Sequence, residues 1–203
     1  MEDLTKQVTK LFNQNHHIAH DIKHVLRVVV LAKYIAKQEG YDIKEAEVAG
    51  LLHDIGRTVQ AGDKGHGPAG VPLAHHLLDT YTDYDEETKS RILSAVEHHG
   101  DLNADGELTF IVQDADMLDG MGAIGIMRAY TSRAELTDYD PENIIATIGR
   151  HGTNIHDQIA FQMEWLEFIH TPAAKNIARK RHDFMAKFLE EFRDEAQGND
   201  FSA

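Results

Sequence analysis

The sequence predicts an all-helical protein folded as a single domain. Apolar residues recur every three or four positions in nearly every periodic segment, which is the spacing of one helix face. No segment alternates apolar and polar residues convincingly enough to predict a strand, and only 4 of the 203 residues are proline. We therefore expect one domain of about eight to ten helices spanning residues 1–203. Its core motifs are expected at 20–130, with C-terminal helices at 141–196 packing on the same domain.

The N-terminal half carries the stronger helical patterns. Its second segment has a long apolar stripe that includes Leu26 and Val30. The third is opened by Asp42 followed by Glu45, which is the pattern of a capping box. The helices expected in this half span 3–13, 21–39, 42–53, 68–81 and 86–99.

In the C-terminal half, glycines at 120, 122 and 125 interrupt the first helical pattern. Prolines at 141 and 172 each open a helix, and the second of these helices is long and amphipathic. The helices expected in this half span 110–119, 126–130, 141–148, 158–169 and 172–195.

Composition narrows the classes of partner. The formal net charge of −14 repels DNA, RNA and anionic lipid, so a polymeric nucleic acid is not expected as the main partner. No apolar stretch approaches the roughly 20 residues that cross a bilayer, and the N-terminus lacks the pattern of a secretion signal. We therefore expect no membrane partner and a cytoplasmic location. Fourteen histidines beside no cysteine indicate metal chemistry with nitrogen and oxygen ligands.

The pair His53-Asp54 closes an apolar run at 48–52 and precedes Gly56. Because a buried carboxylate is costly unless it is paired, hydrogen-bonded or bound to a metal, this pair is a candidate site. Two further acidic residues, Asp114 and Asp116, lie in another apolar segment. Asp116 is the better candidate ligand, and Asp114 suits a helix cap or an acceptor behind the site.

His24 and Arg27 are three positions apart on the second helix, so they share a face. An ordinary alternative is a partly exposed histidine beside an arginine whose head reaches solvent.

The ordered set His24, His53-Asp54 and Asp116 resembles the HD superfamily of metal-dependent phosphohydrolases. Segments 20–28 and 112–125 and the C-terminal 171–189 are similar to a small bacterial subgroup that hydrolyses nucleotides, so the resemblance covers about residues 17–196. It implies that His24, His53, Asp54 and Asp116 are the ligands of a divalent metal ion. Mixed nitrogen and oxygen ligands suit Mn, Fe, Ni, Co or Zn, and Mg less well.

Three more histidines, His66, His98 and His99, lie between the pair and Asp116. In the superfamily, histidines at these stations either hold a second metal ion bridged by the aspartate or lie over the substrate phosphate. The alternative is that His98 and His99 cap the C-terminal end of a helix, where the helix dipole favours positive charge, while His66 is exposed in a loop. His99 has the better register with the superfamily.

The resemblance implies hydrolysis of a phosphoester or phosphoanhydride bond in a small nucleotide or related phosphate by metal-activated water. Asp54, His66, His99 and Arg27 are the expected catalytic residues. Substrate binding is expected from four residues: Arg27, Arg57, His66 and His98.

Two other functions stay open. They are an HD-type di-iron oxygenase and a non-catalytic sensor that binds a metal and a nucleotide. The sequence does not define the oligomeric state, and a homodimer is compatible with it.

Overall fold

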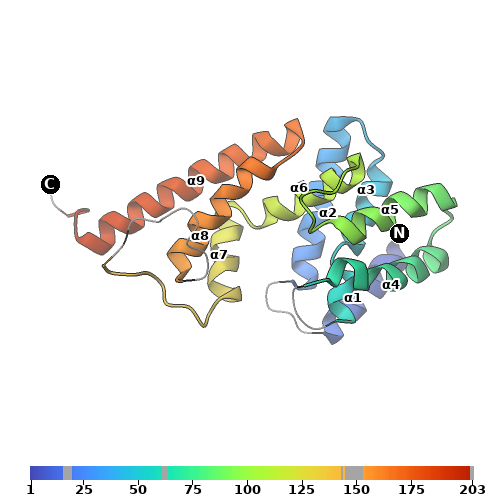
Figure 1. Ribbon diagram of the computed structural model, residues 1–203, viewed down its shortest axis with the longest axis horizontal. Coiled ribbons are helices and arrows are strands. Elements are labelled where there is room, and N and C mark those ends of the chain that lie inside the picture. Colours follow the sequence, from blue (N-terminus) through green and yellow to red (C-terminus); the bar gives the residue numbers. More distant parts are fainter. Residues whose placement is uncertain (16–19, 61–63, 143, 145–152, 202–203) are drawn as a thin grey trace. The chain divides into compact units, whose positions relative to one another are not determined.

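The computed structural model describes residues 1–15, 20–60, 64–142, 144 and 153–201, and these form nine α-helices and two short 3₁₀-helices (Figure 1). No strand occurs among them, and Thr137 and Asn154 form one isolated bridge. The predicted all-helical fold is confirmed. The chain forms two compact units, here called unit 1 (Met1–Asp116 with His170–Ala174) and unit 2 (Met117–Ile169 with Lys175–Ala203). The single domain expected from the sequence stays a prediction.

Unit 1 holds the N-terminal helices. Within it α2 packs against α3, and α4 packs against α5 (Figure 1). The helices of this unit are α1 (Glu2–Gln14), α2 (Ile22–Glu39), α3 (Ile43–Leu52), η1 (Ile55–Thr58), α4 (His66–Tyr81), α5 (Glu86–His98) and most of α6 (Glu107–Asp119).

Aspartates begin three of these helices, because a side-chain oxygen accepts from backbone N–H groups that have no partner inside the helix. Asp21 accepts from the N–H of His24, and Asp85 caps α5 in the same way. Asp42 accepts from Glu45 N–H, but the Glu45 side chain pairs with Arg91 instead of closing the predicted capping box.

In unit 1, α4 and α6 begin a few residues earlier than predicted, at His66 and at Glu107. The stripe of α2 is also narrower than predicted: Leu26 and Val30 are 42% and 67% exposed. The buried stripe of this helix consists of Val25, Val28, Ala32, Ile35 and Ala36.

The beginning of α9 (Pro172–Gln197) belongs to unit 1, where two acidic side chains hold it. Asp114, which is fully buried, accepts from the backbone N–H groups of His170 and Thr171, both at 2.8 Å, and from the Thr171 hydroxyl at 2.7 Å. Glu39 accepts from Ala173 N–H at 2.8 Å. Asp114 is thus an acceptor for the helix start, as the sequence suggested.

Unit 2 contains α7 (Gly122–Ser132), α8 (Ile155–Glu164), η2 (Trp165–Phe168) and most of α9. Its α8 begins earlier than predicted because Asn154 caps it by accepting from Asp157 N–H at 2.8 Å. The helix predicted at 141–148 lies mostly outside the described residues, and its first two positions form a turn. No helix in the described part of the chain has the length and apolar character needed to cross a membrane.

Candidate metal centre

The His53-Asp54 pair lies where α3 ends and η1 begins, in unit 1. His53 closes α3 as its C-terminal cap, and Asp54 is the residue before η1. Both are buried, with exposed fractions of 0% and 1%. The helix end therefore places an imidazole and a carboxylate side by side in the core, as the sequence predicted.

The main chain at the start of α4 packs closely against η1 and the end of α5, which brings α4 near His53 and Asp54. A Cβ atom at Gly56 would lie 1.8 Å from the carbonyl oxygen of His66, and one at Gly67 would lie 2.4 Å from the carbonyl oxygen of Glu97. Only glycine permits these approaches without a shift of the main chain. The two glycines thus allow the start of α4 to sit between η1 and the end of α5, so that His66 reaches Asp54.

His24, His53 and Asp116 form the first group that could hold a metal ion, here called the first triad. The Nε2 atoms of His24 and His53 are 3.2 Å apart, and His24 Nε2 lies 3.4 Å from Asp116 Oδ1. Asp54 Oδ2 adjoins this group, 3.5 Å from His24 Nε2 and 3.7 Å from His53 Nε2. The four ligands expected from the resemblance are therefore brought together.

Asp54, His66 and His99 form a second such group, here called the second triad. It uses the other carboxylate oxygen, Asp54 Oδ1, which lies 3.1 Å from His66 Nε2 and 3.5 Å from His99 Nε2. The two Nε2 atoms are 2.9 Å apart. Asp54 thus belongs to the second triad through Oδ1 and adjoins the first triad through Oδ2.

Two of these imidazoles have their orientation and tautomer fixed from behind. Nδ1 of His53 donates to the Gly50 carbonyl and Nδ1 of His99 donates to the Val96 carbonyl, both at 2.8 Å. In the neutral form of each ring, the Nε2 atom is therefore left with a lone pair directed into the site. Ligands about 2.1 Å from one ion lie about 3.0–3.4 Å apart at right-angled to tetrahedral geometry. The first triad, with separations of 3.2 and 3.4 Å, fits such an ion.

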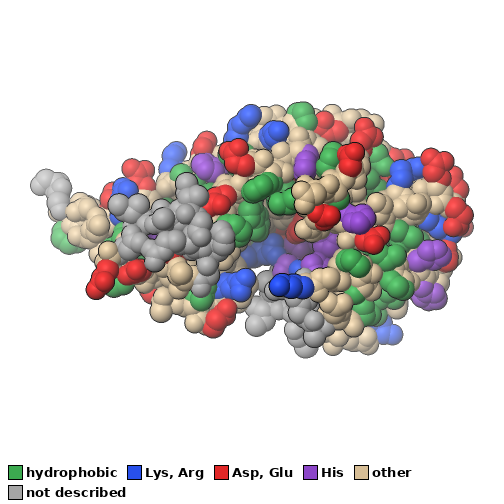
Figure 2. All heavy atoms as spheres, viewed as in Figure 1, with side chains coloured by type: hydrophobic (Ala, Val, Ile, Leu, Met, Phe, Trp, Pro, Cys, Tyr) green, Lys and Arg blue, Asp and Glu red, His purple; other side chains and the backbone are tan. Residues whose placement is uncertain are grey.

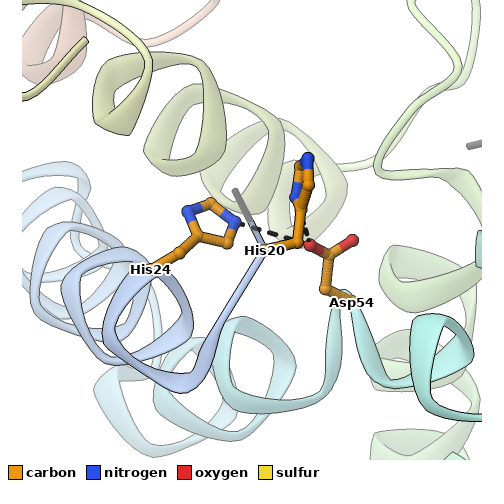
Figure 3. A group of neighbouring side chains, drawn as sticks. All are labelled: His20, His24 and Asp54. Carbon is orange, nitrogen blue, oxygen red and sulfur yellow. Dashed lines mark hydrogen bonds and ion pairs between the residues drawn. The ribbon is translucent and has the colours of Figure 1, made fainter. Parts of the chain in front are cut away.

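His20 also belongs to the site, although it was not among the residues predicted from the sequence. Its Nδ1 donates to Asp54 Oδ2 at 2.8 Å, and its ring meets that of His24 edge to face (Figure 3). His20 precedes the cap residue Asp21, so it lies outside the helix and helical spacing from His24 could not place it.

Arg57 lies directly behind Asp54. Its Nε donates to Asp54 Oδ1 at 2.8 Å, and its side chain is only 7% exposed. Arg27 lies one turn after His24 on α2 and is half-buried. His98, by contrast, is not brought into either triad: its side chain is 42% exposed and lies 3.8 Å from Glu97. Substrate contacts by Arg57 and His98 stay predictions.

Burial and mutual charge set the ionisation of the site. Burial lowers the pKa of His53 to about 4, against the charges of Asp54 and Asp116. Burial alone would raise the pKa of each carboxyl, but the surrounding imidazoles outweigh it and lower both, that of Asp54 to well below its usual range. Near neutral pH the carboxylates are charged and His53 is neutral, which are the states that bind a cation.

Comparison with known proteins identifies the superfamily. Residues 21–121 match the model of the HD domain. The chain is 27% identical over 197 residues to YpgQ of Bacillus subtilis, an alignment that covers 89% of this chain and 86% of YpgQ. It is 32% identical over 118 residues to ribonuclease Y of Lachnoclostridium phytofermentans, but there it spans only 21% of the relative's length.

Solved structures agree along nearly the whole chain. An HD-superfamily hydrolase from Bacillus thuringiensis is similar with a TM-score of 0.76 and 27% identity, covering 96% of this chain and 95% of that one. The crystal structure of Bacillus subtilis YpgQ in complex with ADP is similar in fold with a TM-score of 0.75 and 22% identity, covering 96% and 93%. The chain belongs to the HD-domain superfamily and is a hydrolase of that superfamily.

Proposed function

We propose that this chain is a metal-dependent phosphohydrolase that cleaves a phosphoester or phosphoanhydride bond of a small nucleotide or a related phosphate. The position of Asp54 carries the proposal, because its two oxygens face two different groups of imidazoles. Buried, ionised carboxylates beside several imidazoles form a ligand set for a divalent transition-metal ion. Stabilising the fold alone would not require so many buried histidines and carboxylates in one place.

In this proposal His24, His53, Asp54 and Asp116 hold the divalent ion. Mn, Fe, Ni, Co and Zn suit these ligands better than Mg, which prefers oxygen. A bound ion of this kind lowers the pKa of water and polarises phosphoryl oxygens.

Asp54 is oriented by two donors, His20 on Oδ2 and Arg57 on Oδ1. These contacts turn the carboxylate so that each oxygen faces one triad. Because Arg57 uses its Nε–H on Asp54, we assign it the orientation of this carboxylate. Arg27 is the better phosphate contact, since it follows His24 by one helical turn and its guanidinium can bind phosphate oxygens bidentately.

The second triad contacts the substrate phosphate or holds a second divalent ion. His99 offers a lone pair at Nε2, because its Nδ1–H is used on the Val96 carbonyl. His66 is the more exposed member, at 13% of its side chain, and so is better placed to meet a substrate oxygen. The number of ions bound per chain separates the two roles.

A small nucleotide is favoured over a polymer. Figure 2 shows acidic side chains spread over the visible face, in keeping with the net charge of −14, and such a surface disfavours a polyanion. YpgQ was crystallised with ADP, and its fold matches along nearly the whole chain. The likeness to ribonuclease Y covers about a fifth of that enzyme, so it supports the shared domain and not its substrate.

The experiment is a panel of nucleoside mono-, di- and triphosphates and simple phosphate esters, assayed with Mn, Mg, Co, Ni and Zn, with the products separated. We expect metal-dependent release of phosphate or pyrophosphate, also without oxygen. His53→Ala and Asp54→Ala should abolish metal binding and hydrolysis while the helical circular dichroism largely survives. His75→Ala, which changes an exposed histidine outside both triads, is the matched control.

Full activity of Asp54→Ala would contradict the proposal. An oxygen-dependent product with two irons per chain would identify the oxygenase alternative. Nucleotide binding with no turnover for any metal would identify a sensor.

A further inference from the structure

Gln113 joins α6, the helix that carries Asp116, to the turn at the end of α5 that contains His99. It lies on α6, one turn before Asp116, and is only 1% exposed. Its side-chain Nε2 donates to two backbone carbonyls, that of His98 at 3.0 Å and that of Asp101 at 2.7 Å. Both amide protons are therefore used on the turn that contains His99.

The turn held by Gln113 is short and directly follows α5. Asp101 N–H donates to the His98 carbonyl at 3.0 Å, which closes the chain around His99 and Gly100. His99 is also held from the helix side, where its Nδ1 donates to the Val96 carbonyl. The imidazole is thus fixed between a helix end and a clamped turn.

The end of α5 does not need the Gln113 side chain to satisfy its backbone carbonyls. Gly100 and Asp101 are exposed, so water can reach the end of α5 and satisfy its carbonyls. The Oε1 atom of Gln113 is instead buried with no hydrogen-bond partner among the described residues, which is unfavourable. The unpartnered Oε1 atom lowers stability, while the two hydrogen bonds of Nε2 fix the position of the turn relative to α6.

We infer that Gln113 is a positioning residue: it fixes His99 against Asp54 and His66 by tying the His98–Asp101 turn to the helix of Asp116. The inference rests on the proposed function, because it assigns Gln113 to the second triad. Among the described residues, the Gln113 side chain donates only to the backbone carbonyls on either side of His99 and not to Asp54, so it acts through His99.

The test is Gln113→Met, which keeps the size of the side chain and removes both donors. Gln162→Met is the matched control, since Gln162 is another buried amide with an unpartnered Oε1 but lies in unit 2. In the metal-free protein, nitrogen-15 NMR should show the His99 ring signals moved in Gln113→Met and unmoved in Gln162→Met. Unmoved His99 signals in Gln113→Met would overturn the inference, whatever the substrate is.

Kinetics with the substrate found by the panel give the second arm. Displacement of a catalytic group is expected to lower kcat on the order of tenfold to a hundredfold with little change in KM. In a His99→Ala background the same Gln113→Met change should lower kcat less than about twofold, because the two residues act as one unit.

If Gln113→Met lowered kcat by the same factor in the His99→Ala background as in the wild-type protein, the inference would be overturned. Failure of the proposed function looks different: wild-type protein would then release no phosphate at all, and the NMR arm would still decide the role of Gln113.

Discussion

The Nε2 atoms of His24 and His53 lie 3.2 Å apart in a position closed to solvent, with both residues 0% exposed. Since His53 keeps its proton on Nδ1, its Nε2 lone pair faces the other ring. A cation between the rings would be bound by both nitrogens and by the carboxylate of Asp116. Folding and metal binding should therefore be linked.

Metal removal is expected to lower stability. Addition of Mn at about 100 times its dissociation constant should raise the free energy of unfolding by about 2.7 kcal/mol over protein treated with EDTA. Denaturant unfolding with and without metal measures this difference. Addition of metal should not stabilise the His53→Ala variant. An equal rise in its free energy of unfolding would mean that the ion binds elsewhere.

Substitution of His20 should weaken metal binding without removing a ligand of the first triad. His20→Ala takes away the donor on Asp54 Oδ2, and loss of a contact behind a ligand typically lowers metal affinity by about 10–100-fold. Isothermal titration with Mn measures the change. His75→Ala, an exposed histidine paired with Asp79, serves as control, and equal affinities for both variants would contradict the role of His20.

Gly56→Ala and Gly67→Ala should each destabilise the protein by about 1–3 kcal/mol, because the new methyl group meets backbone at 1.8 and 2.4 Å. Activity should fall as well, since the shift moves His66 away from Asp54. Gly100→Ala is the control: its methyl meets nothing within 4 Å, and its effect should stay within about 0.5 kcal/mol. Chemical denaturation with activity assays checks both. Wild-type behaviour of Gly56→Ala would refute the close approach.

Unit 2 should lose stability in mild acid through His156. Burial lowers its pKa in the folded state, against the charge of Asp157, so the unfolded chain binds the proton more tightly. The contribution of His156 is therefore complete above pH 6.5 and is lost as the pH falls below that value. His156→Gln should reduce the slope of unfolding free energy between pH 7 and 5, measured with metal absent. An unchanged slope would contradict this assignment.

The helices were predictable because their apolar spacing is local. The boundaries of the helices were less predictable. At the start of α4, for example, the main chain packs closely against η1 and the end of α5, and contacts between such distant segments are invisible in the sequence. Leu26 and Val30 are apolar but exposed, so the spacing of apolar residues overestimated the buried face of α2.

The four expected ligands were predictable because their order along the chain resembles that of the HD superfamily, and because Asp54 and Asp116 lie in apolar segments. The roles of adjacent histidines were harder to separate, and the turn after α5 decides between them: His99 points inward and His98 outward. His20 was missed because it reaches Asp54 from outside the helix, across 34 positions of chain.

The attachment of α9 to Asp114 limits how this protein can be shortened. The segment that matches the HD domain ends at residue 121, which invites a truncated version for study. Such a fragment would contain Asp114 but lack His170 and Thr171, which supply all three of its observed hydrogen bonds. A fully buried carboxylate would lose its donors two positions before Asp116. The smallest part of the chain that keeps the metal centre intact is thus discontinuous in sequence. The boundaries of the segment that matches the HD domain therefore do not define a fragment that can be produced by itself.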